Sequence, residues 1–474
     1  WIDRFDKEQY EESIPYMKKA VQLDPSYSAR VREHVELAEN QPAALSAGTE
    51  DKKREILARE TARELITKKK DPEAAEKEIS ERARQIRFGP LTMNPYIEEK
   101  FTWDDNIYLT PENKKADYIS QLSPGIIAKI DMPSFITTGV FGGATKPASP
   151  AEVSSTIVNL AYNADIEQYF SNPKNNNVGH NLVAATIIPS NLFGGKGKTV
   201  FALKDAFKFT TDPATTEITQ FYPRYHNDME ARVKYTPREK IAVGLVYKQS
   251  LEWYTQKAMQ DFNYMEDIIT PALYYDMTPK SALFVDTDLG KVMYYTGNRD
   301  SIFYQISGGV TGQITPKTNV HLKVGAQIRT HKDAELYGDY AALTATGSIA
   351  TWLRRDIYMN LSFGKHVVES TYQNNAYFDL KYAQLQLIKH LTGKLAIEAG
   401  VKLGRNDYPK SGDEGSEGVR IRRDFIWTLK GGISYKILKW IDSTVSYELK
   451  GSDSNFRKFN YMDNRIIANV KALY

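Results

Sequence analysis

The sequence predicts a mainly β fold, a large antiparallel transmembrane β-barrel of about 18 strands over residues 91–474, with a small α-helical segment over residues 1–90. Three observations predict it. Long stretches alternate between apolar and polar residues, short and long connections alternate along the chain, and no run of 18 apolar residues could form a transmembrane helix.

The N-terminal segment has a helical pattern. In YEESIPYMKKAVQLDPSY, Tyr10, Ile14, Met17 and Val21 share one helical face, and Pro25 ends the helix. This stretch resembles the second helix of a tetratricopeptide repeat. Residues 49–88 are dense in Lys, Arg and Glu, and we interpret them either as a docking arm for periplasmic partners or as a charged linker. Because the chain begins with Trp rather than Met, we expect a processed or incomplete chain.

The stretch TPKTNVHLKVGAQIRTH, residues 315–331, shows the strand pattern most clearly. Val320, Leu322, Val324, Ala326 and Ile328 alternate with polar residues and glycine. The apolar face would form the core of a soluble sandwich, but it would meet lipid in a membrane barrel. We expect lipid, with the polar face lining a wet lumen. The same alternation recurs in residues 239–248, 394–404, 424–437 and 440–450.

The connections favour the membrane barrel over the soluble sandwich. Tight connectors recur as TPREK (236), TPKS (278), TPKT (315), LRRD (353), LTGK (391) and ILKW (437). Polar loops lie between them: TGNRD (296), THKDAELYGDY (330), STYQNNAY (370), NDYPKSGDEGSEG (406) and KGSDSNFRKFN (450). Short periplasmic turns and long outer loops are typical of outer-membrane barrels. With an even number of strands, the first strand begins and the last strand ends on the same side of the membrane. The short turns mark that side as the periplasm, so we expect the helical segment there too. Residues 131–155 form either a long excursion or a further strand.

The amino-acid composition limits which partners and sites the protein can have. Lys and Arg number 62 against 59 Asp and Glu, a net charge of +3, so we expect no nucleic-acid partner. The 30 Tyr residues favour a half-apolar surface such as a membrane interface. Cys is absent, which excludes disulfides and thiolate metal sites. The terminal Tyr474, on the lipid-facing parity of the last strand, is similar to the signal that barrel-assembly machinery recognises.

Four stretches resemble the type-2 β-barrel porins, outer-membrane barrels commonly encoded beside exopolysaccharide genes. They are ADYISQLSPGIIAKI (116–130), VNLAYNADIEQYF (158–170), residues 422–455 and YMDNRIIANVKALY (461–474). Asp453, Ser454, Asn455, Tyr461 and Asn464 match the family's last loop and strand. The helical segment departs from that pattern and is similar to polysaccharide exporters with tetratricopeptide repeats before a barrel.

No catalytic motif occurs: the sequence lacks GxSxG, HExxH and a phosphate-binding glycine loop, so we expect no enzyme, cofactor or metal. His226-Asn227-Asp228 is interpreted as a polar cluster, and Asp286 and Asp288 lack a third ligand for Ca²⁺. The parity predicts these lumen-lining residues: Lys248, Lys323, Gln327, Arg329, Glu398, Lys402, Lys430, Glu448, Lys450, Asn469 and Lys471. These charges either line a hydrated path or pair across the barrel and plug it.

The resemblance implies an outer-membrane barrel of a Gram-negative bacterium that takes part in exopolysaccharide export or surface assembly. The alternatives are a general diffusion porin and a structural anchor for a surface appendage or envelope complex. Expected partners are outer-membrane lipid and lipopolysaccharide, barrel-assembly machinery, polysaccharide, and periplasmic or cell-surface proteins that contact residues 1–90 and the long loops.

Overall fold

The computed structural model describes residues 86–133, 155–189, 199–213, 217, 220–278, 280–373 and 375–474. They contain nineteen strands: β1 (Ile86–Phe88), β2 (Leu91–Asp104), β3 (Asp117–Pro133), β4 (Ser155–Tyr169), β5 (Asn177–Pro189), β6 (Thr199–Thr210), β7 (Arg224–Arg238), β8 (Ile241–Tyr254), β9 (Tyr264–Thr278), β10 (Ser281–Tyr294), β11 (Ser301–Thr315), β12 (Thr318–His331), β13 (Tyr340–Trp352), β14 (Ile357–Glu369), β15 (Tyr377–His390), β16 (Leu395–Asp413), β17 (Val419–Leu438), β18 (Ile441–Ser454) and β19 (Tyr461–Leu473). The connections hold short helices: η3 (Pro173–Asn175), η5 (Lys257–Phe262), α7 (Ala334–Tyr337), η6 (Gly415–Glu417) and η7 (Arg457–Phe459).

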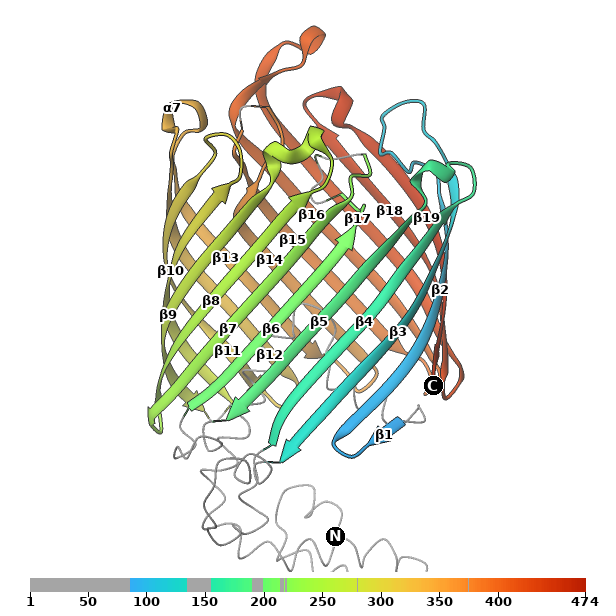
Figure 1. Cartoon of the computed structure of the whole chain (residues 1–474), viewed down its shortest axis with the longest axis vertical. Helices are drawn as coiled ribbons and strands as arrows, with labels where there is room; N and C mark the ends of the chain where they lie inside the picture. Colours follow the sequence, from blue (N-terminus) through green and yellow to red (C-terminus); the bar gives the residue numbers. More distant parts are fainter. Residues whose placement is uncertain are drawn as a thin grey trace, which may run out of the picture. The chain divides into compact units, whose positions relative to one another are not determined.

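Strands β2 to β19 form a closed ring of 18 strands, each antiparallel to the next (Figure 1). The last strand closes the ring against the first, from Arg465 opposite Asp104 to Leu473 opposite Tyr96. The predicted barrel and its strand count are confirmed. Strand β1 pairs with the start of β2, so Ile86–Phe88 are strand and not helix as we predicted. The rest of the predicted helical segment lies outside the described residues.

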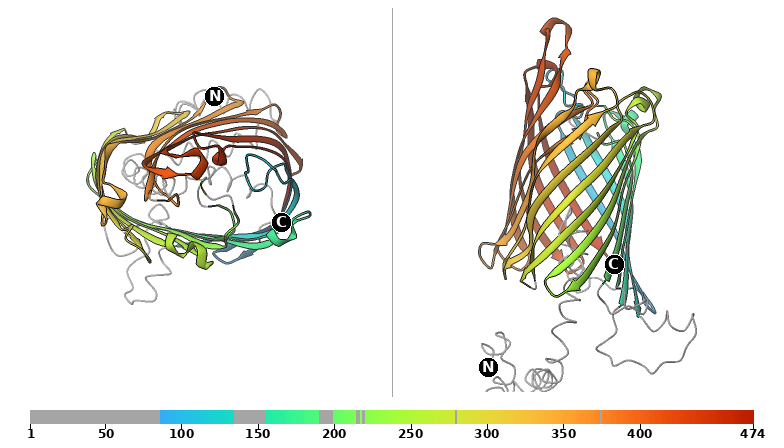
Figure 2. Two further views of the ribbon diagram at one scale, coloured as in Figure 1. Left: turned by 90° about the horizontal axis from the view of Figure 1, so that it is seen from above. Right: turned by 90° about the vertical axis from the view of Figure 1, so that its left-hand side faces the viewer.

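From β7 onward, short and long connections lie at opposite ends of the barrel, as the sequence predicts; residues 134–154 and 190–198, which join β3 to β4 and β5 to β6, lie outside the described residues. Two residues join β7 to β8, β11 to β12 and β17 to β18, whereas residues 105–116, 255–263 and 455–460 form longer connections at the other end. We call these the turn end and the loop end. The predicted loop at 406–418 is wrong in extent, because β16 continues to Asp413 and β17 begins at Val419. These strands form a hairpin that rises above the loop end (Figure 2).

The sequence predicted either a long excursion or a further strand around residues 134–154, and these residues lie outside the described part of the chain. Within the part of the chain that the structure describes, no helix is long and apolar enough to cross a membrane.

Each strand has one apolar face and one polar face. In β12, Val324 and Ile328 are 61% and 60% exposed, while Lys323 on the alternate parity pairs with charged residues of β10. Exposed large apolar side chains with this parity recur around the ring, so this is the outer, lipid-facing side. Val320 shares the parity but is buried, which differs from our expectation that it contacts lipid. Every strand of the ring has 12 or more residues, and at a rise of about 3.3 Å per residue this length spans the hydrocarbon even when the strand is tilted.

Aromatic rings covering glycines fill part of the inner wall. The ring of Phe303 lies over its cross-strand neighbour Gly290, and the ring of Tyr96 lies over Gly125. A Cβ atom at either glycine would overlap the ring. Here glycine provides space for a large neighbour, which is a common pairing in antiparallel sheets.

The wall opens between β13 and β14 at the loop end. Their pairing stops at Ala345 opposite Lys365, although β13 begins at Tyr340 and β14 continues to Glu369. Buried residues from α7, β13 and the start of β15 pack together there: Tyr337, Tyr340, Ala376 and Tyr377. The opening lets the Glu369 carboxylate reach Arg329 on the inner face of β12.

Candidate functional site: the inner wall and the mouth of the barrel

The eleven predicted lumen residues all lie on the inner parity of their strands, and most have a charged or polar neighbour. Lys323 Nζ lies 2.9 Å from Asp286 and 3.0 Å from Asp288. These two carboxylates, for which the sequence offered no third Ca²⁺ ligand, therefore pair with a lysine. Lys450 lies 3.1 Å from Asp463. On β19, Asn469 donates to Glu98 at 2.7 Å, and Lys471 lies 3.3 Å from the same carboxylate. Glu448 lies opposite Lys430 in the β17–β18 register.

Gln327 and Arg329 correct the prediction of a wet lumen at their positions. Both are buried, and Arg329 is only 3% exposed. Arg329 pairs with Glu369, lies 3.8 Å from Glu266, and packs over the ring of Phe303. The sequence could not reveal this burial, because Glu369 lies 40 residues away on β14, which is not a neighbour of β12 in the ring.

Three lysines of the inner face have exposed side chains, and two of them are more exposed than their carboxylate partners. The Lys248 and Lys430 side chains are 46% and 42% exposed, against 21% and 19% for Glu230 and Glu398, at 3.9 and 2.9 Å. Lys402 is also exposed. A solute at this depth therefore meets ammonium groups before carboxylates.

These lysines lie at similar depth on opposite walls. Lys248 and Lys402 each lie seven residues from the turn-end start of their strands, and Lys430 lies eight residues from the turn-end limit of β17. Strands β8 and β17 are nine positions apart in the ring of 18, so they face each other across the lumen. We call Lys248, Lys402 and Lys430 the lysine girdle.

The inner face also carries a cluster near the loop end of β7 and β8. Arg224 lies 2.5 Å from Glu252, and His226 contacts Glu252 at 2.9 Å and Asp228 at 3.1 Å. The polar cluster predicted at His226 thus lies in the lumen wall.

A contact spans the mouth of the barrel at its loop end. Glu217, between β6 and β7, accepts hydrogen bonds from Ser370 Oγ at 2.6 Å, Thr371 N at 2.7 Å and Thr371 Oγ1 at 3.1 Å, all between β14 and β15. These two connections are eight positions apart in the ring, so they lie on nearly opposite sides of the mouth (Figure 2). Arg299, between β10 and β11, donates to the Ser370 carbonyl at 2.7 Å.

The segment that Glu217 contacts also packs against Arg422 through Tyr372. Arg422 on β17 pairs with Asp424 at 2.7 Å, and its guanidinium packs on the rings of Tyr372, Tyr408 and Phe459 at 4.8, 4.8 and 3.4 Å. Cations on aromatic faces and a desolvated ion pair give fixed geometry. Sequence reasoning missed both Glu217 and Arg422. Arg422 lies in the RRD triplet quoted for the family resemblance, but neither residue has a local pattern that predicts distant contacts.

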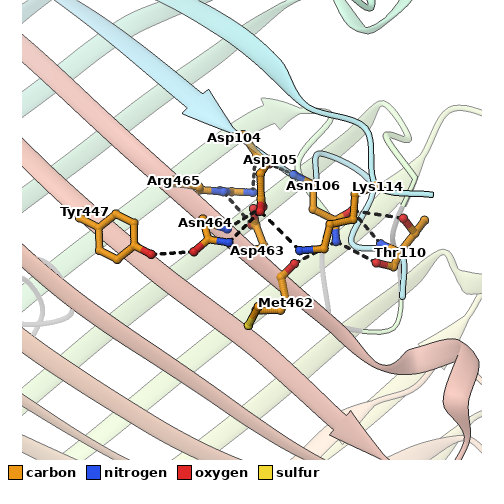
Figure 3. A network of polar contacts seen from close by, with 10 residues as sticks. All are labelled: Asp104, Asp105, Asn106, Thr110, Lys114, Tyr447, Met462, Asp463, Asn464 and Arg465. Carbon is orange, nitrogen blue, oxygen red and sulfur yellow. Dashed lines mark hydrogen bonds and ion pairs between the residues drawn. The ribbon is translucent and has the colours of Figure 1, made fainter. Parts of the chain in front are cut away.

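Polar contacts close the seam between β2 and β19 (Figure 3). Asp105 accepts hydrogen bonds from the backbone and side-chain nitrogens of Asn464, both at 2.7 Å, and Asn106 Nδ2 donates to the Met462 carbonyl at 3.1 Å. Burial acts to raise the pKa of Asp105, but the hydrogen bonds from Asn464 and the nearby Lys114 outweigh it and hold the pKa below its usual value. The seam is therefore strongest when Asp105 is ionised.

Asp104, Asp105 and Asp463 bring carboxylate oxygens within 4.8 Å of one another. Basic side chains already balance them: Arg465 lies 2.9 Å from Asp104 and 3.0 Å from Asp463, close to Lys450. This charge balance favours a structural seam, and we assign no ion to it.

At the chain terminus, the Tyr474 amide donates to the Pro95 carbonyl at 3.0 Å and its ring is exposed. Its role in barrel assembly stays a prediction.

Comparisons with known proteins give a family match over part of the chain. The family model described as "Putative beta-barrel porin 2" matches residues 245–474. No curated protein sequence matches the chain. Among solved structures, the chain is similar to the outer membrane protein opdK from Pseudomonas aeruginosa, with 8% identity over 81% of this chain and 99% of that one and a TM-score of 0.40. It is also similar to OccAB3 from Acinetobacter baumannii, with 10% identity over 82% of this chain and 100% of that one and a TM-score of 0.42. A BenF-like porin from Pseudomonas fluorescens Pf-5 has 9% identity over 82% of this chain and 100% of that one, with a TM-score of 0.42.

Proposed function

Because this chain is a porin-like outer-membrane β-barrel, we propose that it is a diffusion channel for small hydrophilic solutes with a preference for anions. The observation that supports this proposal is the lysine girdle. Ammonium groups on opposite walls attract anions, and a ring of one sign of charge is a common basis of selectivity in pores.

The contact across the mouth favours small solutes over a polymer. Glu217 on one side of the rim bonds to Ser370 and Thr371 on the other, and Arg422 packs on the adjacent Tyr372. A polysaccharide chain would have to pass beside this contact. The description of the matching family model as a porin also supports this alternative rather than the export role that the sequence resemblance implied.

Ion selectivity in planar bilayers tests the proposal. With full-length protein in a KCl gradient, we expect stepwise conductance and a reversal potential that indicates preference for chloride. The triple variant Lys248→Gln, Lys402→Gln and Lys430→Gln should shift the reversal potential toward cations, because Glu230 and Glu398 remain. The matched control Lys291→Gln, Lys389→Gln and Lys394→Gln removes the same charge outside the girdle and should leave it unchanged. Absence of conductance, or unchanged selectivity in the girdle variant, would contradict the proposal.

A gene deletion separates this proposal from the export role. We expect polysaccharide on the cell surface and in the periplasm to be unchanged after deletion. Loss of surface polymer with periplasmic accumulation would support export instead.

A further inference from the structure

The outer face of β14 to β17 carries an unusual pattern of charge. On each of these strands, an apolar run that begins near the turn end is followed toward the loop end by a cation: Lys365 after Phe363, Lys381 after Ala383, Arg405 after Leu403 and Arg423 after Phe425. Strands β8 and β12 end their apolar runs differently. On the outer face of β12, Thr330 follows Ile328, and on β8, Gln249 follows Tyr247. On β10, Lys291 follows Leu289 in the same way, but its neighbours β9 and β11 carry no cation beside it, so the row of adjacent cations is a feature of β14 to β17.

Three of these cations are direct cross-strand neighbours. Lys365 lies opposite Lys381, and Lys381 lies opposite Arg405. Like charges directly opposite each other destabilise a sheet unless anions compensate them. Such a row indicates a place where negative charge is expected.

The protein supplies only part of that negative charge. Asp379 lies 3.5 Å from Lys365 and 3.8 Å from Lys381, while Asp407 lies 2.7 Å from Lys381 and 2.8 Å from Arg405. Arg423 also lies 3.9 Å from Asp407. Four cations thus share two carboxylates. Asp379 and Asp407 lie on the loop-end side of the cation row, which leaves the side toward the membrane without acidic residues from these pairs.

An apolar groove of about 330 Å³ lies directly against the cation row. It is lined by Phe363, Ala383, Leu403 and Phe425, and by Lys365, Lys381 and Arg405 of the cation row. The groove belongs to the lipid-facing side of the barrel. A ligand that fills both parts needs an anionic head and a hydrocarbon tail.

We propose that this groove and its cation row bind a phosphorylated glycolipid of the outer leaflet, with a phosphate beside Lys365, Lys381 and Arg405 and an acyl chain in the groove. Phosphate provides several strong acceptors for adjacent Lys and Arg groups. Soluble anions lack the tail, and neutral lipids lack the charge. The site lies on the outside of the wall, so it is separate from the conduction path.

Native mass spectrometry of the full-length protein in a zwitterionic detergent tests this proposal, with hexa-acylated, bis-phosphorylated lipid A as the probe. We expect wild type to retain one lipid A. The variant Lys365→Gln, Lys381→Gln and Arg405→Gln should bind it at least about tenfold more weakly, since each basic residue near a charged membrane surface contributes attraction. The control Lys280→Gln, Lys389→Gln and Lys394→Gln removes three lysines at the turn end and should bind like wild type.

Two further measurements distinguish the contribution of the groove to lipid A binding from that of the cations. Ala383→Trp fills the groove without changing any charge, and we expect it to weaken lipid A binding as well. Inorganic phosphate and an acidic polysaccharide without acyl chains should compete poorly. Equal affinity in the charge variant or in Ala383→Trp, or competition by the polysaccharide at lipid A concentrations, would overturn the proposal. The heat-modifiable gel shift verifies that each variant is folded.

Discussion

Replacing Glu217 with alanine should loosen the mouth of the barrel. The change removes three hydrogen bonds from a carboxylate to Ser370 and Thr371. Because Glu217 is only partly buried, we take about 1 kcal/mol for each bond, below the usual range for charged groups. The total of about 3 kcal/mol corresponds to a factor of about 150 in the ratio of bonded to released states. The released state should therefore change from rare to well populated.

Single-channel recording detects this change as larger mean conductance or more frequent flicker in Glu217→Ala than in wild type. Glu239→Ala removes a carboxylate at the turn end and serves as the matched control, with an unchanged trace expected. In a double-mutant cycle, the effects of Glu217→Ala and Ser370→Ala on the conductance should not be additive, since both changes break the same hydrogen bond. Identical conductance and noise in Glu217→Ala and wild type would refute the reasoning that this contact restricts the mouth.

Three further predictions concern stability, each measured by urea unfolding in detergent or lipid. Val324→Arg should cost about 2–4 kcal/mol at mid-membrane depth, whereas Thr330→Arg, on the same face nearer the loop end, should cost at most about 1 kcal/mol. Equal costs would show that the facing or depth is misassigned. Asp105→Asn should destabilise the barrel at neutral pH. Because the folded pKa of Asp105 is lowered, the difference from wild type should begin to shrink as pH falls below about 4 and vanish only below the lowered folded pKa, and a difference that did not shrink would contradict the ionised seam. Gly290→Ala should cost about 1–3 kcal/mol because its Cβ overlaps the Phe303 ring, while Gly431→Ala, with open space around it, should not.

Local sequence patterns predicted what depends on neighbours along the chain. The period of two in residues 315–331 placed Val324 and Lys323 on opposite faces, and the connectors TPKS and TPKT marked the turn end correctly. Those patterns follow directly from strand geometry and turn chemistry. The same reasoning failed at 406–418, where Gly, Asp and Pro residues suggested a loop but cross-strand pairing continues β16 to Asp413.

Contacts between distant segments could not be predicted in this way. The burial of Arg329 depends on Glu369 and on an opening in the wall, and the contact across the mouth joins residues about 150 positions apart. The cation row on β14 to β17 needs the register of three strand pairs before Lys365, Lys381 and Arg405 become neighbours. A single sequence shows the charges but not that register.

The seam between β2 and β19 has a consequence for the order of folding. Asn106 bonds to Met462 across 356 residues of sequence, so β2 must wait for nearly the whole chain before it gains its final partner. Until then β2 and β18 are open edges that can pair with the wrong strand. Contacts of such long range slow folding and prolong exposure to aggregation. We therefore expect β2 to be the strand of a newly made chain that needs protection by a chaperone for the longest time. Chains truncated before Tyr461 lack β19, so we expect their barrels to remain open and to be degraded.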